Sequence, residues 1–275
     1  MIEIPEACVL ARQIEEKLAG KRVKSILANH SPHKFAWYHD DPANYDDLLR
    51  DKQLQSATAR GGLVEVFLED TRIVLGEGVA VRFIPADQKR PAKHQLLVEF
   101  TDGSAIVATV QMYGGMWCFK EGEFDNPYYQ IACSKPSPLG EEFDAVYFAG
   151  LLDEKGRKKS AKAFLATEQR IPGLGNGVLQ DILYQANIHP RRSMLSLTDQ
   201  ELETLFLAIK ATLRQMADQG GRDTEKDLFG QPGGYRTILS KNTVNTPCPR
   251  CGELVRKEAY MGGSIYYCSG CQSRS

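Results

Sequence analysis

Four cysteines near the C-terminal end of the sequence have the spacing of a metal site. The pattern is C-x2-C, a spacer of 16 residues and a second C-x2-C, formed by Cys248, Cys251, Cys268 and Cys271. Each pair directs two sulfurs to one point, and four thiolates suit a tetrahedral zinc ion, whose closed coordination sphere makes it structural. Two disulfides are the alternative, but they are typical of oxidising compartments. The Gly262-Gly263 turn between strand-like flanks predicts a β-hairpin for the spacer.

A glycine-rich turn within residues 158–192 has the features of a phosphate site. The turn IPGLGN lies between two helical patterns, the first ending near Gln169 and the second beginning at Asn176. Gly173 and Gly175 allow the backbone to approach a ligand closely, and the second helix directs its N-terminal amides at the same place. Basic residues surround the turn: Lys158, Lys159, Lys162, Arg191 and Arg192. The alternative is a helical hairpin whose glycines only make the turn.

The composition predicts an ordinary globular protein. The chain has 275 residues, 42% apolar and 25% charged, which is long enough for two domains. It contains no apolar run of the ~18 residues that a membrane span needs, and the acids Glu3 and Glu6 at its start are unlike a secretory signal. We therefore expect a soluble, cytoplasmic protein without a membrane partner.

Charge is distributed unevenly along the chain. Residues 1–154 have a net charge of −8, whereas residues 155–275 have a net charge of +7. Such asymmetry favours contact between a polyanion and the basic half. The alternative is a pair of differently charged surfaces with no partner.

The hydrophobic pattern divides the chain into a β-rich part and a helical part. Apolar residues at helical spacing predict a helix over residues 6–20. Strand-like runs follow up to about residue 120, and Asp102-Gly103 between two of them predicts a β-hairpin. After a proline-containing segment the pattern is helical, and residues 199–219 form an amphipathic helix with Thr198 or Asp199 near its N-cap.

Three separated motifs resemble the formamidopyrimidine-DNA glycosylase/endonuclease VIII family. PGLGN followed by a helix and IHPRR is similar to its helix–two-turn–helix, MIEIPEA to its opening Met-Pro-Glu-Leu-Pro-Glu, and GGSIYYCSGCQ to its terminal zinc finger. They occur in the family's order and span almost the whole chain. The resemblance implies an α+β fold: an N-terminal antiparallel β-sandwich with flanking helices (1–125), a linker (126–145), a helix–two-turn–helix domain (146–245) and a four-cysteine zinc ribbon (246–275). DNA would lie in the cleft between the domains.

The resemblance also implies a chemistry for which this sequence lacks a central residue. In the family an N-terminal proline amine attacks C1′ of a damaged, flipped-out nucleotide and forms a Schiff base, and an adjacent glutamate handles protons. Glu3 matches that glutamate and Glu6 matches the second acid of the opening, but Ile2 occupies the proline's position. Because a bulky second residue blocks removal of Met1, the free amine is expected one residue too early. The sequence therefore predicts loss of the Schiff-base lyase chemistry.

Two further cations of the family are absent, while several DNA-binding positions match. Gly62 replaces the lysine of an Arg-Gly-Lys sequence, Gly263 replaces the zinc-finger arginine, and Tyr113 retains the aromatic wedge that fills the gap left by the flipped base. The predicted DNA-binding residues are Asn176, Gly173, Gly175, Lys162, Tyr113, Arg60, Arg191 and Arg192.

Three functions are compatible with this pattern. The first is a DNA-binding relative that has lost the chemistry and recognises damaged DNA. The second is a monofunctional glycosylase in which Glu3 activates water, or an enzyme that uses the Met1 amine as its nucleophile. The third is a protein-interaction module on the same fold. The expected partner is double-stranded DNA, the expected cofactor is one structural zinc ion with no small-molecule cofactor, and a monomer is expected. Residues 221–235 are the candidate lesion-reading loop.

Overall fold

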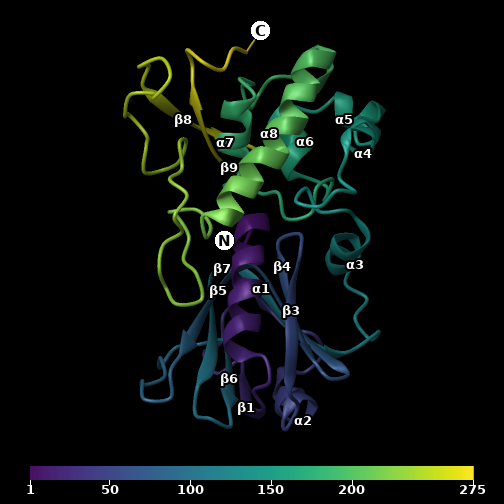
Figure 1. Cartoon of the computed structure of the whole chain (residues 1–275), viewed down its shortest axis with the longest axis vertical. Coiled ribbons are helices and arrows are strands. Elements are labelled where there is room, and N and C mark those ends of the chain that lie inside the picture. Colours follow the sequence, from purple (N-terminus) through teal and green to yellow (C-terminus); the bar gives the residue numbers. More distant parts are fainter. Residues whose placement is uncertain (275) are drawn as a thin grey trace.

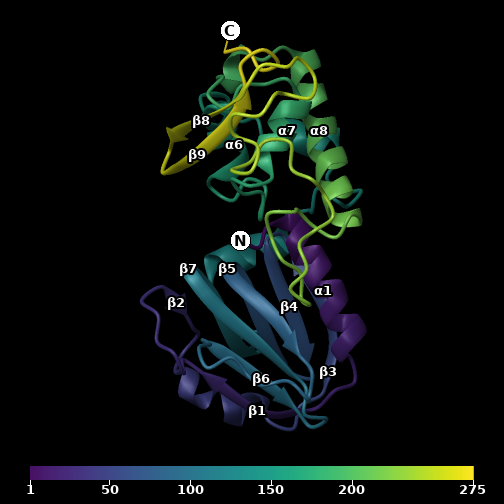
Figure 2. The ribbon, with the colours of Figure 1, turned by 90° about the vertical axis from the view of Figure 1, so that its left-hand side faces the viewer.

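The structure consists of two lobes, and the N-terminus lies between them (Figures 1 and 2). It is a computed structural model that describes residues 1–274. Helix α1 (Ile4–Leu18) lies along the β-rich lobe, and its start contacts helix α8 (Asp199–Asp218) of the helical lobe. In residues 1–274, none of the helices combines the length and the apolarity needed to cross a membrane.

Helix α1 confirms the first predicted helix, with its start at Ile4. Glu3 and Glu6 form a capping box, which satisfies two backbone N–H groups at the helix start, and Pro5 lies in the first turn. The apolar residues of the predicted face are all buried against the β-rich lobe: Ala7, Leu10, Ala11, Ile14 and Leu18.

The β-rich lobe contains one seven-stranded sheet. Its strands are β1 (Val23–Ala28), β2 (Ala36–Trp37), β3 (Leu54–Arg60), β4 (Leu63–Leu68), β5 (Thr71–Ile84), β6 (Leu96–Phe100) and β7 (Ala105–Lys120). The order is β1-β6-β7-β5-β4-β3, all antiparallel, and β2 adds to β7 in parallel. The predicted hairpin at Asp102-Gly103 joins β6 to β7.

The sheet becomes a sandwich because its two longest strands are interrupted midway. The register of β5 against β7 shifts between Glu77 and Val79. Glycine is required there, since a Cβ on Gly78 would lie 2.3 Å from the carbonyl oxygen of Tyr113. Residues from both halves, such as Val66 and Val98, belong to one buried core. This confirms the expected antiparallel sandwich.

Several elements of this lobe have no clear sequence pattern. The prediction omitted the short strand β2 and the one-turn helices η1 (Pro42–Asn44) and α2 (Tyr45–Leu49). The segment expected to be a linker contains helix α3 (Pro127–Ser134), capped by the Asn126 side chain. The predicted domain boundaries themselves remain predictions.

The helical lobe contains the remaining elements. They are α4 (Ala145–Gly150), α5 (Glu154–Arg157), α6 (Ala161–Ala166), α7 (Leu179–Gln185), η2 (Met194–Ser196), α8 and the hairpin of β8 (Val255–Tyr260) and β9 (Gly263–Cys268). Helix α8 begins as predicted, with Thr198 as N-cap in a capping box with Glu201. The predicted hairpin is also present, and Gly262 at its turn has a φ of +72°.

The two helices around the glycine-rich turn are shorter than predicted. Helix α6 ends before Glu168 and Gln169, whose φ values of +60° and +48° are left-handed and incompatible with a continuing helix. Helix α7 begins three residues later than Asn176. Just before α7, the backbone N–H groups of Gly177 and Val178 donate hydrogen bonds to the side chain of Glu3, the N-cap residue of α1.

The first residues of the chain join the two hydrophobic cores. Ile2 belongs to the core of the β-rich lobe, where it is 6% exposed. Ile4 belongs to the core of the helical lobe, where it is 1% exposed. The backbone of this segment therefore passes from one lobe into the other within three residues.

Candidate functional site

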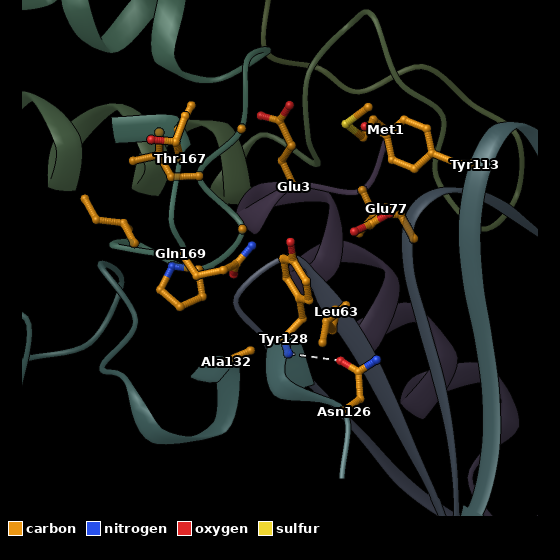
Figure 3. Close-up of a pocket in the computed structure, with 18 of the residues that line it drawn as sticks. Met1, Glu3, Leu63, Glu77, Tyr113, Asn126, Tyr128, Ala132, Thr167 and Gln169 are labelled. Atoms are coloured by element: carbon orange, nitrogen blue, oxygen red, sulfur yellow. Dashed lines mark hydrogen bonds between the residues drawn. The ribbon is translucent and has the colours of Figure 1, made fainter. Parts of the chain in front are cut away.

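A cavity of about 520 Å³ lies between the lobes at the N-terminus. Its lining is largely aromatic and apolar, and includes Trp37, Tyr38, Tyr113, Trp117 and Tyr128. Two carboxylates, Glu3 and Glu77, also border it, and Figure 3 shows them with Met1 and Tyr113. An apolar cavity with a few polar groups is the usual form of a ligand site.

Both oxygens of the Glu3 side chain are bound by the glycine-rich turn. Its carboxylate accepts hydrogen bonds from the backbone N–H groups of Gly177 (2.9 Å) and Val178 (2.8 Å). Burial raises the pKa of this carboxyl, although Arg222 and the two amides act in the opposite direction. The amides that the sequence assigned to a phosphate therefore bind a carboxylate of the same chain.

The glycines of this turn are needed for that contact. A Cβ on Gly175 would lie 2.6 Å from Glu3 Oε1, and a Cβ on Gly177 would lie 1.6 Å from Arg222 Nη1. Gly173 has a φ of +79°, and its carbonyl accepts a hydrogen bond from the N–H of Ile4 (3.0 Å). The alternative interpretation, in which glycines serve the packing of the turn, describes these contacts better than a phosphate site does.

Glu6 and Arg222 complete a buried cluster of charges around the N-terminus. Arg222 donates to Glu6 through Nε (2.9 Å) and Nη2 (2.7 Å), and its Nη1 lies 3.6 Å from Glu3 Oε2. All three residues are 5% exposed or less. Because two acids share one cation here, Arg222 is the residue that makes their joint burial tolerable.

The position of the family's nucleophile holds no reactive amine. The side chain of Ile2 is buried in the β-rich core, and its backbone N–H donates to the carbonyl of Glu77 (2.7 Å). The free amine belongs to Met1 and forms an ion pair with Glu225.

Gly62, at the position of the family's lysine, lies against the glycine-rich turn. A Cβ on Gly62 would come within 2.9 Å of the Cα of Gly173, and one on Gly61 within 2.7 Å of the Pro172 carbonyl oxygen. The turn between β3 and β4 and the turn after α6 therefore touch through their backbones. A side chain at this position would require one of the two turns to move.

Glu77 is a candidate site residue that the sequence motifs did not identify. Its Oε2 is buried and has no hydrogen-bond partner among residues 1–274, and burial raises the pKa of the carboxyl. Its φ of +60° is unusual for a residue other than glycine. The available sequence signal was the Gly-Glu-Gly triplet inside a strand, which is typical of a bulge.

Two predicted DNA-binding residues, Lys162 and Asn176, lie beside Gly263 at the turn of the β8–β9 hairpin. Lys162 Nζ donates to the carbonyl of Tyr260 (2.6 Å), and Asn176 Nδ2 donates to the carbonyl of Ser264 (2.9 Å). A Cβ on Gly263 would lie 3.5 Å from Lys162 Nζ. Burial, and secondarily the charge of Arg191, lowers the pKa of Lys162.

The other predicted DNA-binding residues have separate surroundings. Arg191 joins the hairpin, with its guanidinium 4.1 Å from the ring centre of Tyr260 and Nε 3.1 Å from Glu258 Oε2. Arg192 pairs with Glu201 at the start of α8, and Arg60 pairs with Glu65 (3.1 Å) on the β-rich lobe. Tyr113 borders the cavity, 5.8 Å from the ring centre of Trp37.

The candidate lesion-reading loop, residues 221–235, crosses to the β-rich lobe (Figure 1). Leu228 is fully buried in that lobe's core, and its carbonyl accepts a hydrogen bond from the N–H of Phe83 (2.8 Å). Asp227 accepts from the side chain of Gln13 on α1 (2.9 Å). The middle of the loop is therefore attached to the β-rich lobe, although both ends of the loop belong to the helical lobe.

The four cysteines of the predicted zinc ribbon come together as the spacing indicated. Their sulfur atoms all lie within 4.8 Å of one another, so the group can hold one metal ion. The hydroxyl of the buried Tyr184 lies 3.2 Å from Cys248 Sγ, which links this site to α7.

Replacing Arg222 with methionine is expected to destabilise the protein strongly. Glu3 and Glu6 would remain buried without their cation, and breaking a buried pair costs about 3–5 kcal/mol. Chemical denaturation of R222M and wild type measures the difference in the free energy of unfolding. R50M is the control, because Arg50 is half exposed and pairs with Asp46 four residues away, a contact worth about 0.5 kcal/mol. Equal stability of R222M and R50M would contradict the role given to Arg222.

Comparison with known proteins agrees with the resemblance seen in the sequence. The family described as "Formamidopyrimidine-DNA glycosylase H2TH domain" matches residues 135–227. Formamidopyrimidine-DNA glycosylase of Bacillus cereus is 27% identical over 280 residues, covering 100% of both chains. The protein of the same name from Wolbachia pipientis is 28% identical over 284 residues, covering 99% of this chain and 100% of its own.

Solved structures share the whole fold. The Lactococcus lactis Fpg in complex with abasic-site DNA superposes with a TM-score of 0.84 at 23% identity, covering 98% of this chain and 99% of that one. MutM (Fpg) from Thermus thermophilus gives a TM-score of 0.81 at 21% identity, covering 99% of each chain. This chain is therefore similar over its whole length, in sequence and in fold, to the formamidopyrimidine-DNA glycosylases.

Proposed function

We propose that this protein binds double-stranded DNA in base-excision repair and lacks the Schiff-base lyase chemistry of its family. The loss of lyase chemistry is inferred from the residue at position 2, which is Ile2. Its side chain is held in the β-rich core and its nitrogen is an amide bonded to the carbonyl of Glu77. An amide nitrogen is not a nucleophile for C1′, so no covalent intermediate forms at this position.

The amine of Met1 is a poor substitute. It is displaced by roughly 3.5 Å, the length of one residue, and it is held in an ion pair with Glu225. Attack on a sugar carbon requires a neutral amine held close to it.

The DNA-binding part of the proposal is supported by the relatives and by charge. The Lactococcus lactis relative was solved with abasic-site DNA. In this chain, Lys162 and Arg191 lie together at the β8–β9 hairpin, in the half of the sequence with a net charge of +7. Cations and amide donors of this kind grip phosphates and position the protein without reading sequence.

A monofunctional glycosylase is the second candidate function, favoured by the two carboxyls at the cavity. Burial raises the pKa of both Glu3 and Glu77, and Glu77 has an acceptor oxygen without a partner in residues 1–274. A carboxyl with a raised pKa suits general acid–base catalysis. In such an enzyme Glu77 would activate water more readily than Glu3, whose oxygens already accept two backbone hydrogen bonds.

Strand cleavage and covalent trapping on damaged duplexes distinguish the two functions. Duplexes carrying 8-oxoguanine, thymine glycol or an abasic site are incubated with the protein, then treated with borohydride or with hot alkali. We expect no direct nick and no borohydride-trapped adduct, because neither Ile2 nor Met1 supplies a suitable amine. A family member with the N-terminal proline is the positive control.

Two other outcomes are informative. A trapped adduct or a nick without alkali would overturn the loss of lyase chemistry. Strand breaks that appear only after alkali in the base-lesion duplexes would establish the monofunctional glycosylase, and E77Q and E3Q would then show which carboxyl carries the reaction.

Replacing Lys162 with alanine is expected to weaken DNA binding by about tenfold at moderate salt, irrespective of sequence. The loss of one phosphate contact also lowers the slope of log K against log salt by about 1. Fluorescence anisotropy over a salt series measures both quantities. K158A is the matched control, because Lys158 is an exposed lysine of the same segment that pairs with Glu154. Identical salt slopes for wild type and K162A would remove Lys162 from the interface.

We further propose that the four cysteines bind one structural zinc ion, in keeping with their four thiol ligands and their separation. Elemental analysis is expected to find about one zinc per chain in wild type and a large loss in C248S. Loss of the metal should also lower the melting temperature, because the ion ties the two ends of the ribbon together. C133S, which changes an exposed cysteine elsewhere, should keep its zinc. Wild-type protein without zinc, or with another metal, would contradict the assignment.

A further inference from the structure

The segment of residues 30–38, HSPHKFAWY, forms a surface strap at the edge of the β-rich lobe. Strand β2 within it pairs with β7 at Gly114 and Gly115, immediately after Tyr113, and the Phe35 carbonyl accepts a hydrogen bond from the N–H of Gly114 (2.9 Å). Figure 2 shows β2 as part of a loop beside β7. No motif in the sequence assigns this strap a function.

The strap exposes large aromatic side chains next to the cavity. Trp37 is 42% exposed and Phe35 is 46% exposed, and Met112 on β7 is 67% exposed. The ring of Trp37 lies 5.8 Å from that of Tyr113 at an angle of 32°, and both residues line the cavity. Exposed aromatic groups that gather at the rim of a cavity indicate a binding surface.

The charge of the strap differs from that of its lobe. Residues 1–154 have a net charge of −8, yet residues 30–38 contain one lysine, two histidines and no acid. Lys34 Nζ lies 5.2 Å from the ring centre of Phe35. Aromatic rings interspersed with cations are the chemistry by which proteins hold unpaired nucleic-acid bases, since every base has a π face and a nearby phosphate.

We propose that Trp37 and Tyr113 act as a pair of rings that stack on an unpaired base of the bound DNA at the rim of the cavity. This inference rests on the proposed DNA-binding function and adds to it a preference for DNA in which a base has lost its partner. Tyr113 alone offers one ring, whereas the strap places a second, larger ring beside it. Lys34 and His33 then lie on the same segment to meet the flanking phosphates.

Intrinsic fluorescence tests this directly, because the chain has two tryptophans and they differ in exposure. Trp37 is 42% exposed and Trp117 is 7% exposed. Tryptophan-selective emission of wild type and W37F is recorded while each is titrated with a fully paired duplex or with the same duplex containing one unpaired base. Stacking on a base quenches tryptophan emission, so we expect stronger quenching of wild type by the unpaired base and loss of that difference in W37F.

Affinity gives a second readout on the same duplexes. We expect W37A to bind the duplex with the unpaired base about tenfold more weakly, with less than about a twofold change for the paired duplex, and W37F to recover most of the loss. Melting temperatures of both variants check that they are folded.

The outcomes distinguish this inference from the function on which it rests. If wild type binds neither duplex, both the proposed function and the stacking pair are wrong. If it binds both duplexes but the quenching persists in W37F, or W37A weakens both duplexes equally, only the stacking pair is overturned.

Discussion

The buried cluster of Glu3, Glu6 and Arg222 is the constraint on which the rest of the structure depends. Two buried carboxylates are tolerated because one guanidinium and the amides of the glycine-rich turn supply their donors. The same three residues fix the path of the first turn of α1. Since Ile2 enters one core and Ile4 the other, this path also fixes how the two lobes meet.

The same constraint sets the contacts of the N-terminal residues. Ile2 is packed in the β-rich core, Glu3 accepts hydrogen bonds from two backbone N–H groups, and the Met1 amine is paired with Glu225. Among the carboxyls at the cavity, Glu77 has the oxygen for which residues 1–274 provide no donor.

Backbone contacts also surround the two glycines that replace the family's cations. Gly62 lets the β3–β4 turn touch the turn after α6, and Lys162 and Asn176 donate hydrogen bonds to hairpin carbonyls beside Gly263. The DNA contacts that we propose are the basic hairpin region of one lobe and the aromatic strap of the other.

Local patterns in the sequence determined a large part of the architecture. The faces of α1 and α8, the turn at Asp102-Gly103 and the four-cysteine ribbon all follow from residue spacing within a short segment, and the structure has each of them. Their physical basis is local: helical periodicity, capping, turn conformation and ligand geometry act over a few residues.

Tertiary structure alone decided what the glycine-rich turn binds. Its glycines and amides suit a phosphate or a carboxylate equally well, and the choice is made by Glu3, which lies 174 residues away from Gly177 in sequence. The burial of Leu228 in the opposite lobe, the pairing of β2 with β7 and the unpartnered oxygen of Glu77 are of the same kind. These contacts join segments that are far apart in the sequence, so the residue pattern within any one segment does not predict them.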